Sequence, residues 1–283
     1  MAGYFYIGGQ KMDLLVEKGN SRTYLSRYKV ITTSFEESSP SVKRNNTQIQ
    51  YRNGNVDFGG WNEVKTIDYV GYYRAEDLEN EEYLREKIYA LLSAPDGYYI
   101  TQLKNDSDNS YERPGENTGD YFEKQVNRPS HKRFYVYASS LESELVGSYG
   151  GHVLYKISVT FTTMKLPYGE SVPRDLDINN GIIPYAGTVP CNQLEQGFTV
   201  EFTAKEAGSN LKLSLNGIDF IAPGNVSSGD VFKLSGYEYL RNGISIVKST
   251  NKAYFKLLPG IANKISSSIA GEIRILNFQN LYA

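Results

Sequence analysis

The sequence has 283 residues, with 30 basic and 32 acidic side chains and a net charge of −2. A chain of this length is expected to form two domains, each large enough to bury its own core. The balanced charge argues against a basic nucleic-acid-binding surface, and a single cysteine, Cys191, excludes an internal disulfide and a cysteine-based metal site.

The N-terminal stretch "MAGYFYIGGQKMDLL" lacks a basic segment followed by a long apolar run, so we expect no signal peptide. No run approaches the roughly 20 apolar residues of a membrane span. We therefore expect a protein that is made and folded in a cytoplasm. The 24 tyrosines, against one tryptophan, indicate a β-rich chain or a surface used for assembly.

One helix is predicted over residues 78–92. Leu84, Ile88, Leu91 and Leu92 recur at helical spacing, and acidic residues crowd the start, where the helix dipole favours them. Pro95 and Gly97 end the pattern. We expect this helix to lie against a sheet, with its acidic first turn in solvent.

The segment Lys104–His131 has no sustained periodicity and is rich in Asp, Asn, Gly and Pro. A structureless segment of this length in a compact domain is usually functional or mobile. We expect an extended arm or loop that orders against a neighbouring protein.

Strands are expected where apolar and polar residues alternate. The alternating stretches are Phe134–Tyr137, His152–Met164, Phe198–Thr203, Leu211–Leu215 and Ala270–Phe278. Tight hairpin turns are expected where Asn or Asp precedes Gly, because such pairs accept positive φ angles. The four pairs are Asn53-Gly54, Asp96-Gly97, Asn216-Gly217 and Asn242-Gly243. A cluster of prolines predicts a domain boundary near Asp177, dividing the chain into residues 1–177 and 178–283.

The residues offer little for catalysis, which needs positioned acids, bases or nucleophiles. The two histidines, His131 and His152, form no spaced metal-binding pair, and nothing places either beside Cys191. Glu142 and Glu144 lie two apart in a polar stretch, where solvent-facing positions are more common than a glycosidase pair. We therefore predict no enzyme, no catalytic, metal or cofactor-binding residue, and no cofactor.

Three further features have alternative interpretations. The glycine-rich stretch Gly147–His152 is followed by no helix pattern, which argues against a phosphate-binding loop. Trp61 beside two glycines suits a core or interface position better than a sugar platform. Asp230 follows a turn of small residues and is expected to accept backbone N–H groups there, rather than to orient a sugar hydroxyl.

The ordered series of segments resembles the distal tail (Dit) protein family of siphophages. In the N-terminal half these segments are "YFYIGGQKM", "TTSFEESSPSVKRNNTQIQYRNGNVDFGG", the predicted helix and "YKISVTFTTMKLPYGES". In the C-terminal half they are "IIPYAGTVP", "FTVEFTA", "LSLNGIDFI", "SSGDVFKL", "YLRNGISI" and "FKLLPGIANKI". The resemblance covers nearly the whole chain and depends on the order of the segments, not on one decisive motif.

This resemblance implies a mainly β fold: an N-terminal β-sandwich or barrel-like ring domain with one α-helix, and a C-terminal galectin-like (jelly-roll) β-sandwich. It also implies a virion structural protein at the tip of a long non-contractile tail. Six copies would form a hub ring, single or stacked in two, between the tail tube protein and the tail-associated lysin or tail-tip protein. Receptor-binding or baseplate proteins would attach to the C-terminal domains, and DNA would only pass through the channel.

A second interpretation is a carbohydrate-binding module that contacts host cell-wall polysaccharide directly. Its contact surface would be tyrosines of the C-terminal half, such as Tyr237, Tyr239 and Tyr254. Galectin-type sugar sites also use a tryptophan platform with arginine and histidine neighbours. No tryptophan or histidine follows His152, which argues against that route.

Overall fold

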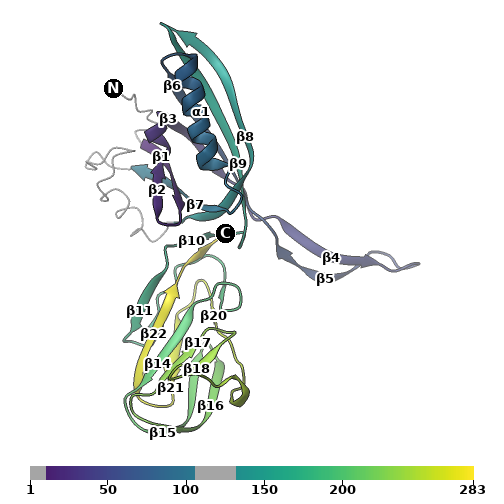
Figure 1. The fold of residues 1–283 in the computed structure, drawn as a ribbon. Helices are drawn as coiled ribbons and strands as arrows, with labels where there is room; N and C mark the ends of the chain where they lie inside the picture. The colour runs from purple at the N-terminus through teal and green to yellow at the C-terminus, as the bar shows by residue number, and fades with distance from the viewer. Residues whose placement is uncertain (1–10, 106–131) are drawn as a thin grey trace. The chain divides into compact units, whose positions relative to one another are not determined.

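The computed structural model describes residues 11–105 and 132–283 (Figure 1). The chain divides into two compact units, one made of the residues up to Gly169 with Ala283, the other of Glu170–Tyr282. Asp177, where the proline cluster suggests a boundary, instead lies inside a strand of the second unit, β11 (Arg174–Ile178). The prolines therefore surround the first strands of the second unit rather than mark a linker after the first.

The first unit contains an antiparallel sheet of seven strands in the order β2-β1-β7-β8-β9-β6-β3. The strands of this unit are β1 (Lys11–Lys18), β2 (Ser21–Tyr24), β3 (Val30–Glu37), β4 (Val42–Gln48), β5 (Asn55–Asn62), β6 (Thr66–Ala75), β7 (Tyr98–Asn105), β8 (Phe134–Tyr149) and β9 (His152–Thr163). A 3-10 helix, η1 (Leu25–Tyr28), follows β2. Strand β1 contacts β3 although four strands lie between them in the sheet order, so the sheet is strongly curved. The curvature agrees with the expected barrel-like domain, although the two edge strands, β2 and β3, are not hydrogen-bonded to each other among the described residues.

The predicted helix is present as α1 (Leu78–Leu92) and lies along one face of β6, β8 and β9 (Figure 1). Asp77 caps its first turn by accepting a 2.7 Å hydrogen bond from the Asn80 amide. The helix buries Leu84, Ile88 and Leu92 in the main core, where the aromatic side chains come from the strands. Burial of a side chain of this size stabilises the fold by about 1.5–3 kcal/mol each.

The first unit also buries polar side chains, among them Asp13 and Thr32. The Asp13 carboxylate is buried and accepts hydrogen bonds from the Leu14 amide, the Ser26 amide and the Ser26 hydroxyl. Burial raises the pKa of Asp13 to about 7 in spite of these bonds, which act in the opposite direction. The buried Tyr69 hydroxyl shares a 3.0 Å hydrogen bond with the Thr32 hydroxyl. Burial also raises the pKa of Tyr69, so loss of hydration is the main cause of the pKa shifts of both groups.

The second unit is a β-sandwich of a six-stranded sheet, β11-β22-β14-β17-β18-β19, and a four-stranded sheet, β12-β21-β15-β16. Its further elements are β12 (Ile182–Ile183), β13 (Cys191–Asn192), β14 (Thr199–Ala204), β15 (Gly208–Leu215), β16 (Ile218–Val226), β17 (Val231–Leu234), β18 (Tyr239–Arg241), β19 (Ile244–Ser245), η2 (Val247–Ser249), β20 (Lys256–Leu257), β21 (Asn263–Ser267), β22 (Gly271–Phe278) and β23 (Leu281–Tyr282). A two-residue strand, β10 (Gly169–Glu170), lies at the division between the units. Phe220 of one sheet stacks on Tyr239 of the other with ring centroids 5.4 Å apart, so the sheets pack face to face.

Three of the four predicted hairpins form. Asn216-Gly217 and Asn242-Gly243 are two-residue turns with positive φ at both positions, and Gly54 ends the loop between β4 and β5. The prediction is wrong for Asp96-Gly97, which connects α1 to β7. Gly97 has φ +69° in this connection, immediately before β7 begins at Tyr98, so the glycine takes a positive φ angle without closing a hairpin.

Most of the predicted polar arm lies outside the described residues. Its first two residues, Lys104 and Asn105, end strand β7 and pair with β1. The sheet thus continues two residues beyond the point where the alternation of the sequence becomes unreadable.

Candidate functional site

The most unusual feature of the first unit is a hairpin, β4–β5, that leaves the sheet. Strands β4 and β5 pair only with each other among the described strands, as a two-stranded sheet that extends away from the rest of the unit (Figure 1). Every residue of β4 is exposed. An isolated two-stranded hairpin is only marginally stable in water. This projecting hairpin therefore needs either a firm attachment or a partner that covers it.

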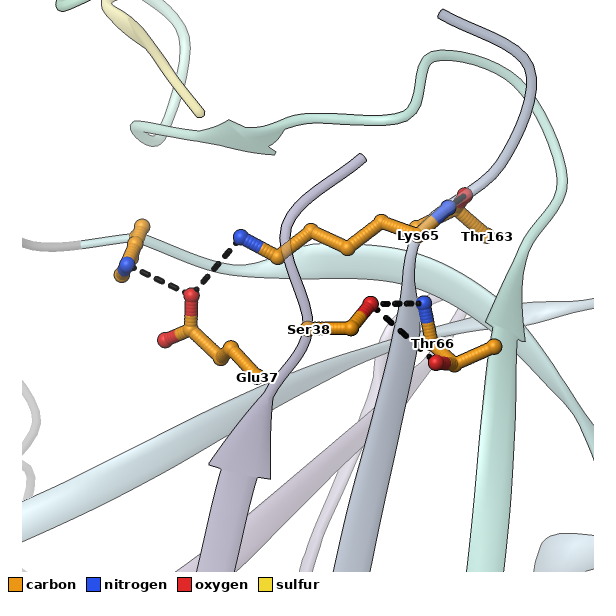
Figure 2. A network of polar contacts seen from close by, with 6 residues as sticks. Glu37, Ser38, Lys65, Thr66 and Thr163 are labelled. Atoms are coloured by element: carbon orange, nitrogen blue, oxygen red, sulfur yellow. Dashed lines mark hydrogen bonds and ion pairs between the residues drawn. The ribbon is translucent and has the colours of Figure 1, made fainter. Parts of the chain in front are cut away.

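The attachment is a polar network at the base of the projecting hairpin, where β3 ends and β6 begins (Figure 2). The Ser38 amide donates to the Thr66 carbonyl at 2.9 Å, and the Ser38 hydroxyl accepts from the Thr66 amide at 3.0 Å. The Lys65 amide donates to the Thr163 hydroxyl, and the Thr163 amide donates to the Lys65 carbonyl, each at 3.0 Å. The chain segments that enter and leave the hairpin are thus bonded to each other and to the end of β9.

A buried cation strengthens this base. The Lys65 side chain is only 3% exposed, and its ammonium lies 3.0 Å from the Glu37 carboxylate. Glu37 also forms an ion pair with the Lys132 ammonium at 2.6 Å. The ammonium groups of Lys65 and Lys132 both lie within 6 Å of the centroid of the Phe134 ring. A buried ammonium is tolerated only when it is paired and hydrogen-bonded. Glu37 is therefore the group that makes a buried lysine possible at the base of the projecting hairpin.

The tip of the projecting hairpin carries an exposed aromatic side chain on a strained backbone. Tyr51 is 98% exposed and has φ +64°, a left-handed conformation that is unusual for a bulky residue. The Arg52 amide donates to the Ile49 carbonyl at 3.1 Å and closes the turn. Backbone strain of this kind persists where the surroundings impose it and often marks a functional position.

Exposed apolar side chains in the first unit concentrate at two places. Of the thirteen large exposed apolar residues among its described residues, five are on the projecting hairpin: Val42, Ile49, Tyr51, Phe58 and Trp61. Six lie at the opposite end of β6, where β8, β9 and the first residues of α1 meet: Leu78, Tyr83, Leu145, Val146, Tyr149 and Leu154. We call this second group the far-end patch. Concentrations of exposed apolar surface typically mark interaction sites.

A hydrogen-bonded tyrosine holds the parts of the far-end patch together. The Tyr73 hydroxyl donates to the Glu81 carboxylate of α1 at 2.8 Å and bonds the Ser143 hydroxyl of β8 at 2.9 Å. Glu81 also forms an ion pair with Arg85 at 3.2 Å. The start of the helix and the end of the β8–β9 pair are thereby fixed beside each other.

Among the described residues, the side chains considered for chemistry lie on different strands, except for Glu142 and Glu144, which are two residues apart on β8. Glu142 and Glu144 are exposed on β8, and His152 is half-buried at the start of β9. Gly150-Gly151 is the two-residue turn between these strands, with φ +59° and +77°. Burial raises the pKa of the Cys191 thiol to about 12, so it is not a nucleophile. His131 lies outside the described residues.

Trp61 is 53% exposed on β5, which excludes a core position and leaves an interface or a sugar platform. Sequence reasoning missed the projecting hairpin as a surface, although Trp61 and its neighbouring glycines were a visible sign of it. The polar strand opposite Trp61 gives no alternation from which an exposed hairpin could be recognised.

Two of the four residues of the second unit considered for sugar binding, Asp230 and Tyr239, are engaged within that unit, whereas Tyr237 is exposed and Tyr254 is half-buried. Asp230 is buried and accepts hydrogen bonds from the Ser227 amide at 2.7 Å, Arg241 at 2.5 Å and Asn242 at 2.7 Å, as expected for a turn residue. The Ser227 hydrogen bond is the main reason that the pKa of Asp230 is lowered. Tyr239 is 2% exposed, so its predicted place on a sugar-binding surface is wrong. Its ring packs between the two sheets, where it stacks on Phe220.

Over residues 11–105 and 132–283, no cluster of three or more His, Cys, Asp or Glu side chains is placed to hold a metal ion. Over the same residues, no helix combines the length and the apolar character that crossing a membrane requires. The notable surfaces of the first unit are therefore the projecting hairpin and the far-end patch.

Comparisons with known proteins agree with the resemblance seen in the sequence. No family model and no curated protein matches the chain. The structure is similar to that of SPP1 Dit, described as a paradigm of the hub adsorption apparatus in phages that infect Gram-positive bacteria. The TM-score is 0.63 and the identity 11%, over 96% of this chain and 99% of SPP1 Dit.

The structure of the phage P2 baseplate in its activated conformation with calcium also matches, with a TM-score of 0.40 and 7% identity over 96% of this chain and 98% of that chain. Because the likeness to SPP1 Dit spans both units, it confirms the resemblance and the mainly β fold class. The chain has the fold of a phage Dit hub protein.

Proposed function

We propose that this protein is a structural distal tail protein, located at the tail tip of a bacteriophage with a long non-contractile tail. The observation that carries the proposal is the shared fold with SPP1 Dit over nearly the full length of both chains. A likeness that includes both units and their order along the chain is more specific than one confined to a common β-sandwich. The function itself is inferred by analogy from that fold.

In this proposal six copies of the first unit assemble into a hub ring, single or stacked in two. The ring joins the tail tube protein to the tail-associated lysin or tail-tip protein, and DNA passes through its channel. The exposed apolar residues of the projecting hairpin and the far-end patch support a unit that is completed by association. The balanced net charge of −2 is compatible with close packing of many copies.

The second unit acts as an adaptor of the galectin-like type, to which receptor-binding or baseplate proteins attach. Of its candidate sugar-binding side chains, Asp230 and Tyr239 are engaged in contacts within the unit, whereas Tyr237 is exposed and Tyr254 is half-buried. The protein catalyses no reaction and needs no cofactor in this proposal.

The test is the molar mass of the purified full-length chain, measured by size-exclusion chromatography with light scattering. The proposal predicts a hexamer or a double hexamer, or a monomer that forms a ring when its tail tube and tail-tip partners are added. The contrary result is a protein that stays monomeric with those partners and is retained by purified cell-wall polysaccharide. That result would favour a carbohydrate-binding module.

A further inference from the structure

The two apolar surfaces of the first unit lie at opposite ends of the same strand. The projecting hairpin leaves the sheet where β6 begins, at Thr66, and the far-end patch surrounds the point where β6 ends, at Ala75. Ten residues of extended strand span about 33 Å. The hairpin also extends away from the sheet (Figure 1), so it cannot reach the far-end patch of its own chain.

The charges of the two surfaces are complementary. Between residues 42 and 63 the hairpin has three basic and two acidic side chains. The Lys43–Glu63 and Arg44–Asp57 ion pairs use both acids, which leaves Arg52 at the tip without an ion-pair partner among the described residues. Arg52 directly follows the exposed Tyr51 in the sequence of the tip.

The far-end patch has the opposite balance. On α1 the exposed carboxylates of Glu79 and Glu82 lie beside Leu78 and Tyr83, and the Lys87 ammonium lies 5.2 Å from the centroid of the Tyr83 ring. On β8 the exposed carboxylates of Glu142 and Glu144 flank Ser143, so they project from the face opposite to the one that bonds towards α1. The other basic neighbours are Arg74 and Lys156, so the patch has four exposed carboxylates and three basic side chains. None of the four carboxylates forms an ion pair with a residue of the described ranges. Two of them, Glu79 and Glu82, alternate along α1 with the exposed Leu78 and Tyr83.

We propose that the tip of the projecting hairpin of one copy docks on the far-end patch of a second copy of this chain. Ile49 and Tyr51 lie against Leu78 and Tyr83, and Arg52 meets the carboxylates of Glu79 and Glu82. The two surfaces differ, so the contact is head-to-tail, and repeated contacts of this kind close into a ring when the rotation between copies permits it. This contact rests on the proposed ring and names the surfaces that build it.

The contact explains two features of the tip together. The strained backbone of Tyr51 presents its ring outward, where a free monomer gains nothing from it. The next residue, Arg52, has no ion pair among the described residues and adds charge attraction and selectivity to this apolar anchor. In the assembled ring both groups are covered.

The test uses the full-length protein and its assembly measured by light scattering across a concentration series. Tyr51→Asn removes the ring but tolerates the left-handed backbone, and Arg52→Glu reverses the charge at the tip. Each is expected to raise the concentration needed for half-assembly by about tenfold or more. Tyr237→Asn and Lys248→Glu, at exposed positions of the second unit, are matched controls that should leave assembly unchanged.

Charge rescue makes the test specific. Arg52→Glu combined with Glu79→Lys and Glu82→Lys restores opposite charges in every contact, so assembly should return towards the wild-type concentration. If wild-type rings form and all these variants assemble equally well, the docking contact is overturned while the ring remains. If the tip variants keep the ring and lose only binding to another tail protein, the partner is that protein and the contact is likewise overturned.

A covalent readout covers the case in which the free protein forms no ring. With Arg52→Cys and Glu79→Cys in one chain, mild oxidation should link separate copies into a ladder of oligomers, because the two positions are too distant to join within a chain. The native Cys191 is buried and does not interfere. A chain that neither assembles nor forms this ladder overturns the contact together with the ring, whereas a ladder from a monomeric protein supports the contact.

Discussion

The base of the projecting hairpin gives the sharpest prediction on stability. Replacing Glu37 by Gln leaves the Lys65 ammonium buried, with a neutral acceptor in place of its carboxylate. Removing one member of a buried ion pair costs about 3–5 kcal/mol. Glu37 is 21% exposed and Lys132 is 32% exposed, so water reaches the network, and we expect a loss below that range, about 2–3 kcal/mol.

This loss corresponds to a fall of roughly 5–10 °C in the melting temperature of a unit of this size. The matched control is Glu63→Gln, since the Lys43–Glu63 pair is about half exposed on both sides. An exposed pair contributes about 0–1 kcal/mol. Trp61 is the only tryptophan and lies on the hairpin, so urea unfolding followed by tryptophan fluorescence reports directly on this region.

Lys65→Met tests whether the loss of stability in Glu37→Gln comes from the unpaired buried lysine. This change removes the buried charge and leaves Glu37 paired with Lys132, so it should cost less than about 1.5 kcal/mol. In the Lys65→Met background, Glu37→Gln should then cost under about 1 kcal/mol. If Glu37→Gln costs the same in both backgrounds, the buried lysine is not the reason for the loss and this account of the base is wrong.

Three further predictions concern buried and turn residues. The pKa of Asp13, about 7, lies above its ordinary value of 3.8, so between these two pH values the folded protein keeps a proton that the unfolded chain releases. The free energy of unfolding should therefore fall as the pH rises from about 4 to about 7. Asp13→Asn should remove that fall from the pH profile of urea unfolding. With a pKa of about 12, the Cys191 thiol should not react with Ellman's reagent at pH 8 until denaturant is added, and rapid reaction of the native protein would contradict its burial. Asp230→Ala should cost about 2–3 kcal/mol of stability, because three donors lose their acceptor. It should leave binding to wall polysaccharide unchanged. A loss of polysaccharide binding without a loss of stability would indicate that Asp230 belongs to a sugar-binding site.

Much of the fold could be predicted from local sequence. The helix over residues 78–92 was readable because its apolar spacing, acidic start and Pro-Gly end agree with one another. The turns at Asn216-Gly217 and Asn242-Gly243 were readable because both flanks alternate. Asp96-Gly97 was misread because hairpins and helix-to-strand connections both use a glycine with positive φ, and only the partner of the next strand distinguishes them.

The candidate site could not be predicted in the same way. The exposed β4 strand has no apolar face, so the periodicity that identifies a half-buried strand is absent. The buried position of Lys65 depends on Glu37, which also pairs with Lys132. These three residues are distant in sequence and meet only through the pairing of β3, β6, β9 and β8. The far-end patch likewise combines a helix start with the end of a strand pair. Such features depend on tertiary contacts, for which one sequence carries no local signal.

The most direct test of the central claim is electron microscopy of the purified full-length protein, alone and with its tail tube and tail-tip partners, with the mass of the particles measured in parallel. The account predicts rings with sixfold symmetry whose mass is that of six or twelve copies, and their loss in Tyr51→Asn. Single particles that never close into rings under any of these conditions, together with specific retention on cell-wall polysaccharide, would contradict it.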